Sequence, residues 1–156
     1  MPSVDLTEAD KRLLRLIQSN ARVSTQDLAE AAGLSSSPAW RRLKRLEDLG
    51  VITAQVALLD PAKLGLGAQA YVQVSLTDHG EATVARFDRL VQDQPQILDC
   101  ARVTGGFDYI LRVVTRDAED LERFLLRHLL ASGVVRTATT SFVLRQMKST
   151  TELPLD

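Results

Sequence analysis

Three short segments with helical periodicity, each preceded by a serine or threonine, occupy residues 7–50 and constrain the fold more than any other feature. Thr7 precedes an acidic first turn, and apolar side chains then recur at helical spacing to about Ser19. Ser24 precedes a second and shorter segment, which Gly33 ends as a left-handed C-cap would. The pattern predicts two short helices joined by a loop.

A third helix is predicted from Ser35, acting as its cap, to Leu49, with Gly50 as the stop. Pro38 falls in the first turn, where its missing N–H removes no helical hydrogen bond. Two short helices joined by a tight turn that contains Gly33, the second helix being longer and basic, are typical of a helix-turn-helix.

The third helix carries a basic face. Residues 1–60 hold equal numbers of basic and acidic side chains, yet half of the basic ones lie between Arg41 and Arg45. Contact with phosphates and base edges requires such clustering, whereas a solvated amphipathic helix without DNA contacts is the plainer alternative. Hydroxyls at a helix N-terminus can also bind a phosphate or only cap the helix. We expect DNA contacts from Ser35, Ser36, Ser37, Trp40, Arg41, Arg42, Lys44 and Arg45.

Residues 51–59 are rich in strand formers and end at Asp60-Pro61, which predicts a strand and then a turn. Beyond this point, periodicity predicts strands and helices in the order strand-helix-strand-strand-helix-strand, typical of a ferredoxin-like domain. The predicted strands span residues 70–76, 97–103, 109–114 and 135–144, and the predicted helices span 81–92 and 118–130, the second capped by Asp117.

The fold class is therefore α+β, with a helix-turn-helix and a connector strand followed by a ferredoxin-like βαββαβ domain. The predicted domains are residues 1–60, which bind DNA and include the connector strand, a linker over 61–67, and an oligomerisation domain over 68–156.

The sheet of this second domain is expected to need a partner. Helices cover only one face of a ferredoxin-like sheet. Apolar residues such as Val72, Val74, Leu111 and Val113 are expected on one side, with equally apolar neighbours on the other. Two such faces cannot both lie in water, so we expect the chain to dimerise.

Composition excludes several classes of protein. The formal net charge of −1 means that any DNA contact must come from local clustering of positive charge. The single Cys100 cannot close an intrachain disulfide, and no Cys/His cluster has metal-ligand spacing, so neither a metal nor another cofactor is expected. The charged start of the chain and the lack of a long apolar run predict a cytoplasmic protein that is neither exported nor embedded in a membrane.

An enzyme is the first alternative, because ferredoxin-like domains host catalysis in several unrelated proteins. His79 and His128 have no Asp, Ser or metal-ligand companions in the sequence and are interpreted as surface residues. Cys100 lies in a predicted strand and is interpreted as a small packed side chain. No catalytic residue is predicted.

The sequence resembles the Lrp/AsnC family of transcription regulators over nearly the whole chain. The similar segments are Leu28-Ala29-Glu30 before Gly33-Leu34-Ser35, Arg42-Leu43 with Leu46-Glu47, Gly50-Val51-Ile52, Leu59-Asp60-Pro61, Thr104 to Tyr109, and Gly133-Val134 ahead of Thr137 and Thr139. The resemblance implies a winged or strand-extended helix-turn-helix that binds DNA, a linker, and a ferredoxin-like effector domain that forms homodimers and often tetramers or octamers. It also implies that amino acids bind at interfaces between dimers.

The resemblance places an effector site on one loop and the last strand. The implied residues are Thr104, Gly105, Gly106, Phe107, Asp108, Tyr109, Thr137 and Thr139. Backbone N–H groups of a Gly-Gly turn suit a carboxylate, and Asp108 suits an ammonium group. In the alternative interpretation, the glycines supply positive φ for a tight turn and Asp108 only braces it.

Residues 37–42 and 147–154 resemble a subgroup that includes a cysteine-responsive regulator, although this chain has Ala39 where that subgroup often has Cys. We therefore expect a transcription regulator that binds double-stranded DNA and responds to a small amino acid. The alternative is an oligomeric metabolite-binding module without DNA function.

Overall fold

The computed structural model describes residues 4–155, which form two compact units. The first unit contains the chain up to Leu58 together with the segment from Lys148 onward, and the second spans Leu59–Met147. The predicted second domain, residues 68–156, includes this last segment. Side chains of the first helix hold the backbone of this segment, which is why it packs with the first unit instead.

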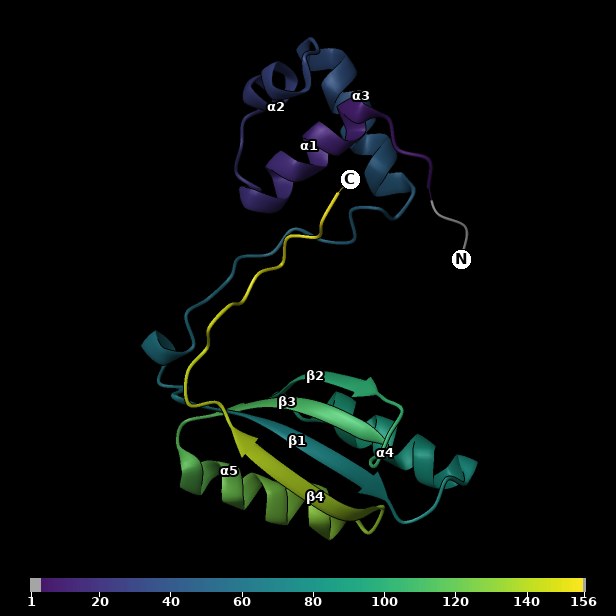
Figure 1. Ribbon diagram of the computed structural model, residues 1–156, viewed down its shortest axis with the longest axis vertical. Coiled ribbons are helices and arrows are strands. Elements are labelled where there is room, and N and C mark those ends of the chain that lie inside the picture. The colour runs from purple at the N-terminus through teal and green to yellow at the C-terminus, as the bar shows by residue number, and fades with distance from the viewer. Residues whose placement is uncertain (1–3, 156) are drawn as a thin grey trace. The chain divides into compact units, whose positions relative to one another are not determined.

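The first unit consists of α1 (Glu8–Ser19), α2 (Thr25–Ala32) and α3 (Ser36–Asp48), as predicted (Figure 1). Thr7 and Asp10 form a reciprocal capping box at the start of α1. Ser24 caps α2 through the N–H of Asp27, and Gly33 ends it with a φ of +67°. Leu13, Leu28, Ala29, Ala32 and Ala39 form the buried core of this unit.

The prediction of a strand over residues 51–59 is wrong. This segment forms no β-ladder with any other segment of the described chain. Its strand-forming side chains favour extended backbone, but a ladder also needs a neighbouring strand to accept and donate hydrogen bonds. Val56, Leu58 and Leu59 are consequently exposed.

The second unit has the predicted order βαββαβ, which confirms the ferredoxin-like pattern (Figure 1). Its elements are β1 (Ala68–Leu76), α4 (Glu81–Asp93), β2 (Ile97–Arg102), β3 (Tyr109–Thr115), α5 (Ala118–Phe124) and β4 (Val135–Phe142). The strands form one antiparallel sheet in the order β2-β3-β1-β4. A short 3-10 turn, η1 (Ala62–Leu64), precedes β1.

The segment predicted as one helix over 118–130 changes pitch along its length. The α-helix ends at Phe124 and continues as a π-helical turn, η2 (Leu125–Leu129), and a 3-10 turn, η3 (Leu130–Ser132). Leu129 stays fully buried in the core, so the apolar face is retained through the change.

One face of the sheet packs on the helices. Val72 of β1 lies opposite Leu111 of β3, and both side chains are completely buried. Phe87 of α4 is also completely buried, and the centroid of its ring lies 4.6 Å from the centroid of the Tyr109 ring. Alternation along β1 therefore points every second side chain into one core shared with α4 and the α5 segment.

None of the helices in the described chain packs on the opposite face of the sheet (Figure 1). By alternation it bears Tyr71 and Gln73 of β1 and Arg112 of β3, with Thr139 of β4 opposite Gln73. The expectation of equally apolar neighbours on this face is therefore wrong. The face is mixed, with polar side chains around Tyr71, which is 39% exposed.

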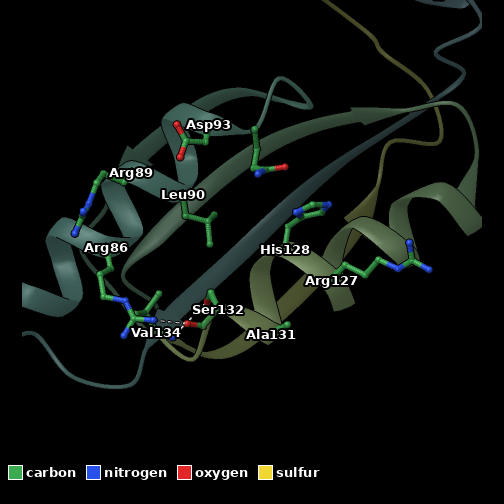
Figure 2. A pocket seen from close by; sticks show the side chains of 10 residues that line it. Arg86, Arg89, Leu90, Asp93, Arg127, His128, Ala131, Ser132 and Val134 are labelled. Atoms are coloured by element: carbon green, nitrogen blue, oxygen red, sulfur yellow. Dashed lines mark hydrogen bonds between the residues drawn. The ribbon is translucent and has the colours of Figure 1, made fainter.

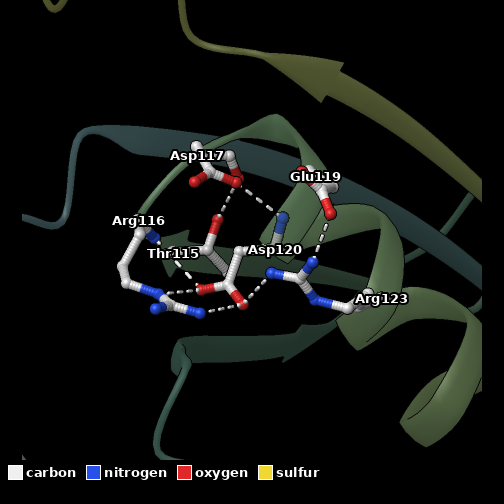
Figure 3. A network of polar contacts seen from close by, with 6 residues as sticks. All are labelled: Thr115, Arg116, Asp117, Glu119, Asp120 and Arg123. Atoms are coloured by element: carbon white, nitrogen blue, oxygen red, sulfur yellow. Dashed lines mark hydrogen bonds and ion pairs between the residues drawn. The ribbon is translucent and has the colours of Figure 1, made fainter.

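A network of charged side chains fixes the start of α5 (Figure 3). Asp117 caps the helix as predicted, accepting from the N–H of Asp120 at 2.7 Å. Asp120 then receives two hydrogen bonds from the guanidinium of Arg116, both at 3.0 Å, and one from Arg123. These donors, the Arg116 guanidinium above all, hold the pKa of Asp120 well below its usual range.

Candidate DNA-binding helix and effector loop

The N-terminus of α3 exposes three serines. The helix begins at Ser36, and Ser35 occupies the cap position, yet its hydroxyl makes no capping hydrogen bond. Ser35 is therefore the cap residue as predicted, but its side chain does not cap the helix. Ser35, Ser36 and Ser37 are all exposed, which leaves their hydroxyls open to an external acceptor or phosphate.

Arg42 points to the protein rather than only to solvent. Its Nη1 lies 3.0 Å from Oδ1 of Asp10, which is completely buried in α1. Oδ2 of the same carboxylate accepts from the N–H and hydroxyl of Thr7, at 3.0 and 2.7 Å. Arg45 lies farther away, with Nη1 3.8 Å from Oδ2. One acidic residue of α1 thus orients two of the predicted DNA-binding arginines.

The pKa of Asp10 reflects a balance of opposing effects. Burial by itself raises this pKa, because a carboxylate loses water, but hydrogen bonds from Thr7 and Arg42 outweigh the burial and leave the pKa below its ordinary value. Asp10 therefore stays ionised at neutral pH. No sequence motif marks the pair, since 32 positions separate Asp10 from Arg42.

Arg41 is the least engaged of the basic side chains on α3. It is exposed, and within the described part of the chain no carboxylate lies at ion-pair distance from it. Lys44 pairs instead with Glu47 and Asp48 of its own helix, at 3.7 and 3.2 Å. Trp40 is 56% exposed beside Arg41. The surface of α3 therefore offers a free guanidinium and an aromatic ring.

The loop between β2 and β3 holds the predicted effector residues. It is closed by the N–H of Val103, which donates to the carbonyl of Asp108 at 3.0 Å. Gly105 has a φ of +133°, which side-chain-bearing residues rarely adopt, whereas Gly106 has no positive φ. The need for positive φ therefore explains the first glycine and not the second.

Asp108 anchors this loop to the end of β1. Its N–H donates to the carbonyl of Val74 at 2.9 Å, and its Oδ2 accepts from the N–H of Leu76 at 2.8 Å. Oδ1 lies 2.8 Å from Nε2 of His79. The His79 hydrogen bond, followed by that of Leu76, lowers the pKa of Asp108, so the group is ionised at neutral pH.

The interpretation of His79 as a residue without an acidic companion is wrong. Asp108 lies 29 positions away in the sequence, and only the pairing of β1 with β3 brings the two together. His79 is thus an effector-loop neighbour that sequence reasoning missed. Among the described residues, the side chain of Asp108 bonds only to the Leu76 N–H and to His79, and no serine or cysteine nucleophile of the kind that a catalytic triad uses joins the pair.

Strand register brings Thr137 near this loop. Thr137 of β4 lies opposite Ser75 of β1, next to the point where Asp108 binds the β1 backbone, and the neighbouring Arg136 also lowers the pKa of Asp108 electrostatically. Thr139 lies two pairs farther along, opposite Gln73. Both threonines are exposed.

Tyr109 differs from the other predicted effector residues. Its ring is buried against Phe87 on the helix-covered side of the sheet, and that burial raises its pKa. Tyr109 therefore packs in the core beneath the loop instead of facing an effector. Thr104, Gly105 and Gly106 are exposed at the loop surface, and Phe107 is half-buried.

A hollow of about 510 Å³ lies between α4 and the η2–η3 segment (Figure 2). Arg86 reaches across it and donates to the carbonyl of Ser132 at 2.9 Å. Arg89 and Arg127 lie at its rims and extend away from its centre in Figure 2. The cationic groups of this hollow therefore do not converge on one point.

Other chemistry-bearing groups are dispersed. Cys100 packs against the core, and burial, helped by Asp88 and Asp99, raises the pKa of its thiol to about 11. Between residues 4 and 155, no group of three His, Cys, Asp or Glu side chains is placed to hold a metal ion. No helix in the same range is long and apolar enough to cross a membrane.

Comparison with known families assigns each part of the chain. Residues 69–153 match the Lrp/AsnC ligand binding domain, and residues 6–53 match a winged helix-turn-helix DNA-binding domain. The DNA-binding transcriptional activator DecR of Escherichia coli (strain K12) is 39% identical over 97% of this chain and 99% of its own length. The HTH-type transcriptional regulator AldR of Mycolicibacterium smegmatis is 34% identical over 96% of this chain and 87% of its own.

Solved structures agree with these matches. A transcriptional regulator from Neisseria meningitidis, crystallised as a complex with L-Met, superposes with a TM-score of 0.94 at 38% identity, covering 97% of this chain and 98% of that one. An AsnC family transcriptional regulator from Agrobacterium tumefaciens superposes with a TM-score of 0.90 at 35% identity, covering 96% and 97%. The chain therefore belongs to the Lrp/AsnC family of DNA-binding transcription regulators.

Proposed function

We propose that this regulator binds operator DNA through α3 as a homo-oligomer in the cytoplasm, and that a small amino acid bound at the 104–108 loop changes this binding. The observation that carries the proposal is the anchored, ionised Asp108 beside the glycine amides of that loop. The Neisseria meningitidis relative in complex with L-Met supports an amino acid as the effector.

The loop offers complementary groups to an amino acid. Within the described chain, the N–H groups of Gly105 and Gly106 donate to no backbone or side-chain acceptor, so they are open to a carboxylate. Asp108 has lone pairs beyond those used by Leu76 and His79, and it can accept from an ammonium group. Thr137 and Thr139 contribute hydroxyls from β4.

DNA contact centres on Arg41, with the serines at the start of α3 and Trp40 beside it. Within residues 4–155 Arg41 has no acidic partner, so its guanidinium can reach a phosphate or base edge without breaking an ion pair to any of them. Lys44 and Arg45 lie on the same helix with weaker intramolecular contacts, whereas Arg42 acts mainly by holding Asp10.

Oligomerisation uses the uncovered face of the sheet. We propose that a second copy of this chain covers this face. The face carries Tyr71 and Ile110 among the polar side chains of β1, so it offers both apolar and hydrogen-bonding groups to a partner. Homodimers formed in this way can assemble further into tetramers or octamers, which would place two effector loops near one another.

A metabolite-binding oligomer without DNA function is the competing proposal. The test begins with a thermal-shift screen of the twenty amino acids, cysteine and methionine included, since a ligand that binds only the folded state raises the melting temperature. Fluorescence anisotropy on the DNA upstream of the chain's own coding sequence follows, with and without the stabilising amino acid. Stabilisation with no DNA binding at any salt concentration favours the competing proposal.

A further inference from the structure

The C-terminal segment from Lys148 onward, which we call the tail, is fastened to α1 through its backbone. The Gln18 carboxamide makes two hydrogen bonds with Leu153: Nε2 donates to the carbonyl at 3.3 Å, and Oε1 accepts from the N–H at 2.6 Å. Arg15 donates from Nη2 to the carbonyl of Leu155 at 2.5 Å. Figure 1 shows the yellow end of the chain reaching α1.

The pair of bonds from Gln18 resembles the contacts between neighbouring β-strands, because one residue receives both a donor and an acceptor. The side chain of Leu153 is 71% exposed, so the contact depends on the extended backbone rather than on side-chain packing. The tail also forms one wall of a groove of about 820 Å³, whose other walls are α1 and residues 51–58.

The positions at which the chain enters β1 and leaves β4 determine what this contact can constrain. Ala70 pairs with Phe142, and the N–H of Val143 donates to the carbonyl of Gln69 at 2.9 Å. The chain therefore enters β1 and leaves β4 at the same end of the sheet. Two chain segments, 59–67 and 143–147, thus connect this end of the sheet to the DNA-binding unit.

The other end of the same two strands carries the effector loop. Leu76 pairs with Val135, and the N–H of Leu76 is the group that binds Asp108. The β1–β4 pair therefore runs from the effector loop at one end to both connecting segments at the other. A change in the register or twist of this strand pair acts on both connections together.

We propose that the contact of Gln18 with Leu153 is a clasp that makes the tail a second tether between the β1–β4 pair and the DNA-binding unit. A unit held by one flexible connection samples a wide range of positions, whereas a second connection narrows this range. In a dimer, narrowing raises the effective concentration of the second DNA-binding unit at its half-site. The DNA consequence rests on the proposed function, but the clasp does not.

The clasp is tested by hydrogen exchange of the Leu153 amide in the full chain. We expect protection in the wild type, a loss of at least tenfold in Gln18→Ala, and retained protection in Gln18→Glu, which keeps an acceptor oxygen. Gln92→Ala, which removes an exposed glutamine from α4, is the matched control. Exchange of wild-type Leu153 at the rate of an unstructured peptide overturns the clasp.

The tether is tested on a duplex selected by the wild type from a random-sequence library, and on the half of that duplex. Gln18→Ala and deletion of residues 150–156 should each weaken binding to the full duplex several-fold and leave binding to the half unchanged. The tether is overturned if the wild type, Gln18→Ala and the deletion variant bind the full duplex with equal affinity. Failure of the wild type to select any DNA contradicts the proposed function instead, and hydrogen exchange then decides the clasp alone.

Discussion

Arg42 of α3 donates to the completely buried carboxylate of Asp10 in α1 across 3.0 Å. The pair joins the helix proposed to contact DNA to the first helix of the same unit. It also separates two neighbouring arginines by role, because Arg41 has no such partner within the described residues. Stability and DNA binding should therefore respond differently to substitutions at adjacent positions.

Arg42→Ala should lower the free energy of unfolding by about 1–3 kcal/mol, because the buried Asp10 loses a charged partner while Thr7 still donates to it. Arg41→Ala should leave the unfolding free energy nearly unchanged and weaken DNA binding by about 1–3 kcal/mol. Urea unfolding and anisotropy titrations measure the two effects. The separation of roles fails if Arg41→Ala destabilises the protein as much as Arg42→Ala does.

Acid should destabilise the first unit through Asp10. The pKa of Asp10 is lower in the folded state than in the unfolded chain, so its contribution to stability is complete above the ordinary Asp pKa and disappears as pH falls through the lower folded value. In the wild type, we expect the unfolding free energy to decrease as the pH is lowered from about 4. Asp10→Asn should show a weaker dependence over this window, measured by urea unfolding at each pH.

Asp108→Asn should retain the loop but lose the amino-acid response. The amide oxygen still accepts from Leu76, whereas the negative charge that attracts an ammonium group is gone. We expect affinity for the stabilising amino acid to fall at least tenfold in calorimetric titration, with DNA binding in the absence of effector unchanged. A mutant that binds the amino acid like the wild type would show that Asp108 only braces the loop.

Tyr71→Glu should weaken self-association. The substitution places a charge in the middle of the uncovered sheet face, where a second copy would have to desolvate it. Light scattering coupled to size exclusion should show a smaller species than the wild type. Leu126→Glu, an equally drastic change at an exposed leucine of η2, is the control and should not alter the mass. An unchanged mass in Tyr71→Glu would place the interface elsewhere.

Cys100 should react slowly with thiol reagents in the native state. With a pKa of about 11, only about one thiol in a thousand is ionised at pH 8, and the thiolate is the reactive form. Reaction with Ellman's reagent should become fast only on addition of denaturant. Rapid modification of the native protein would indicate that the β2 edge opens readily.

The sequence by itself determined the elements whose stabilising contacts are local. Thr7 and Asp10 are three positions apart, and Ser24 and Asp27 have the same spacing, so their caps could be predicted from neighbouring residues. Alternation along β1 likewise predicted that Val72 and Val74 share one face, and both are completely buried there. Because periodicity and capping act within one turn or one strand, the three N-terminal helices and the order of elements in the second unit could be predicted.

Only the tertiary structure decided the contacts between distant positions. Asp10 and Arg42 are 32 positions apart, His79 and Asp108 are 29 apart, and Gln18 and Leu153 are 135 apart. Such pairs depend on how the elements pack, and no local pattern marks them. Residues 51–59 show the converse case, in which a local pattern predicted an element that tertiary structure did not complete. Their side chains favour extended backbone, but a strand exists only where a second segment completes its hydrogen bonds.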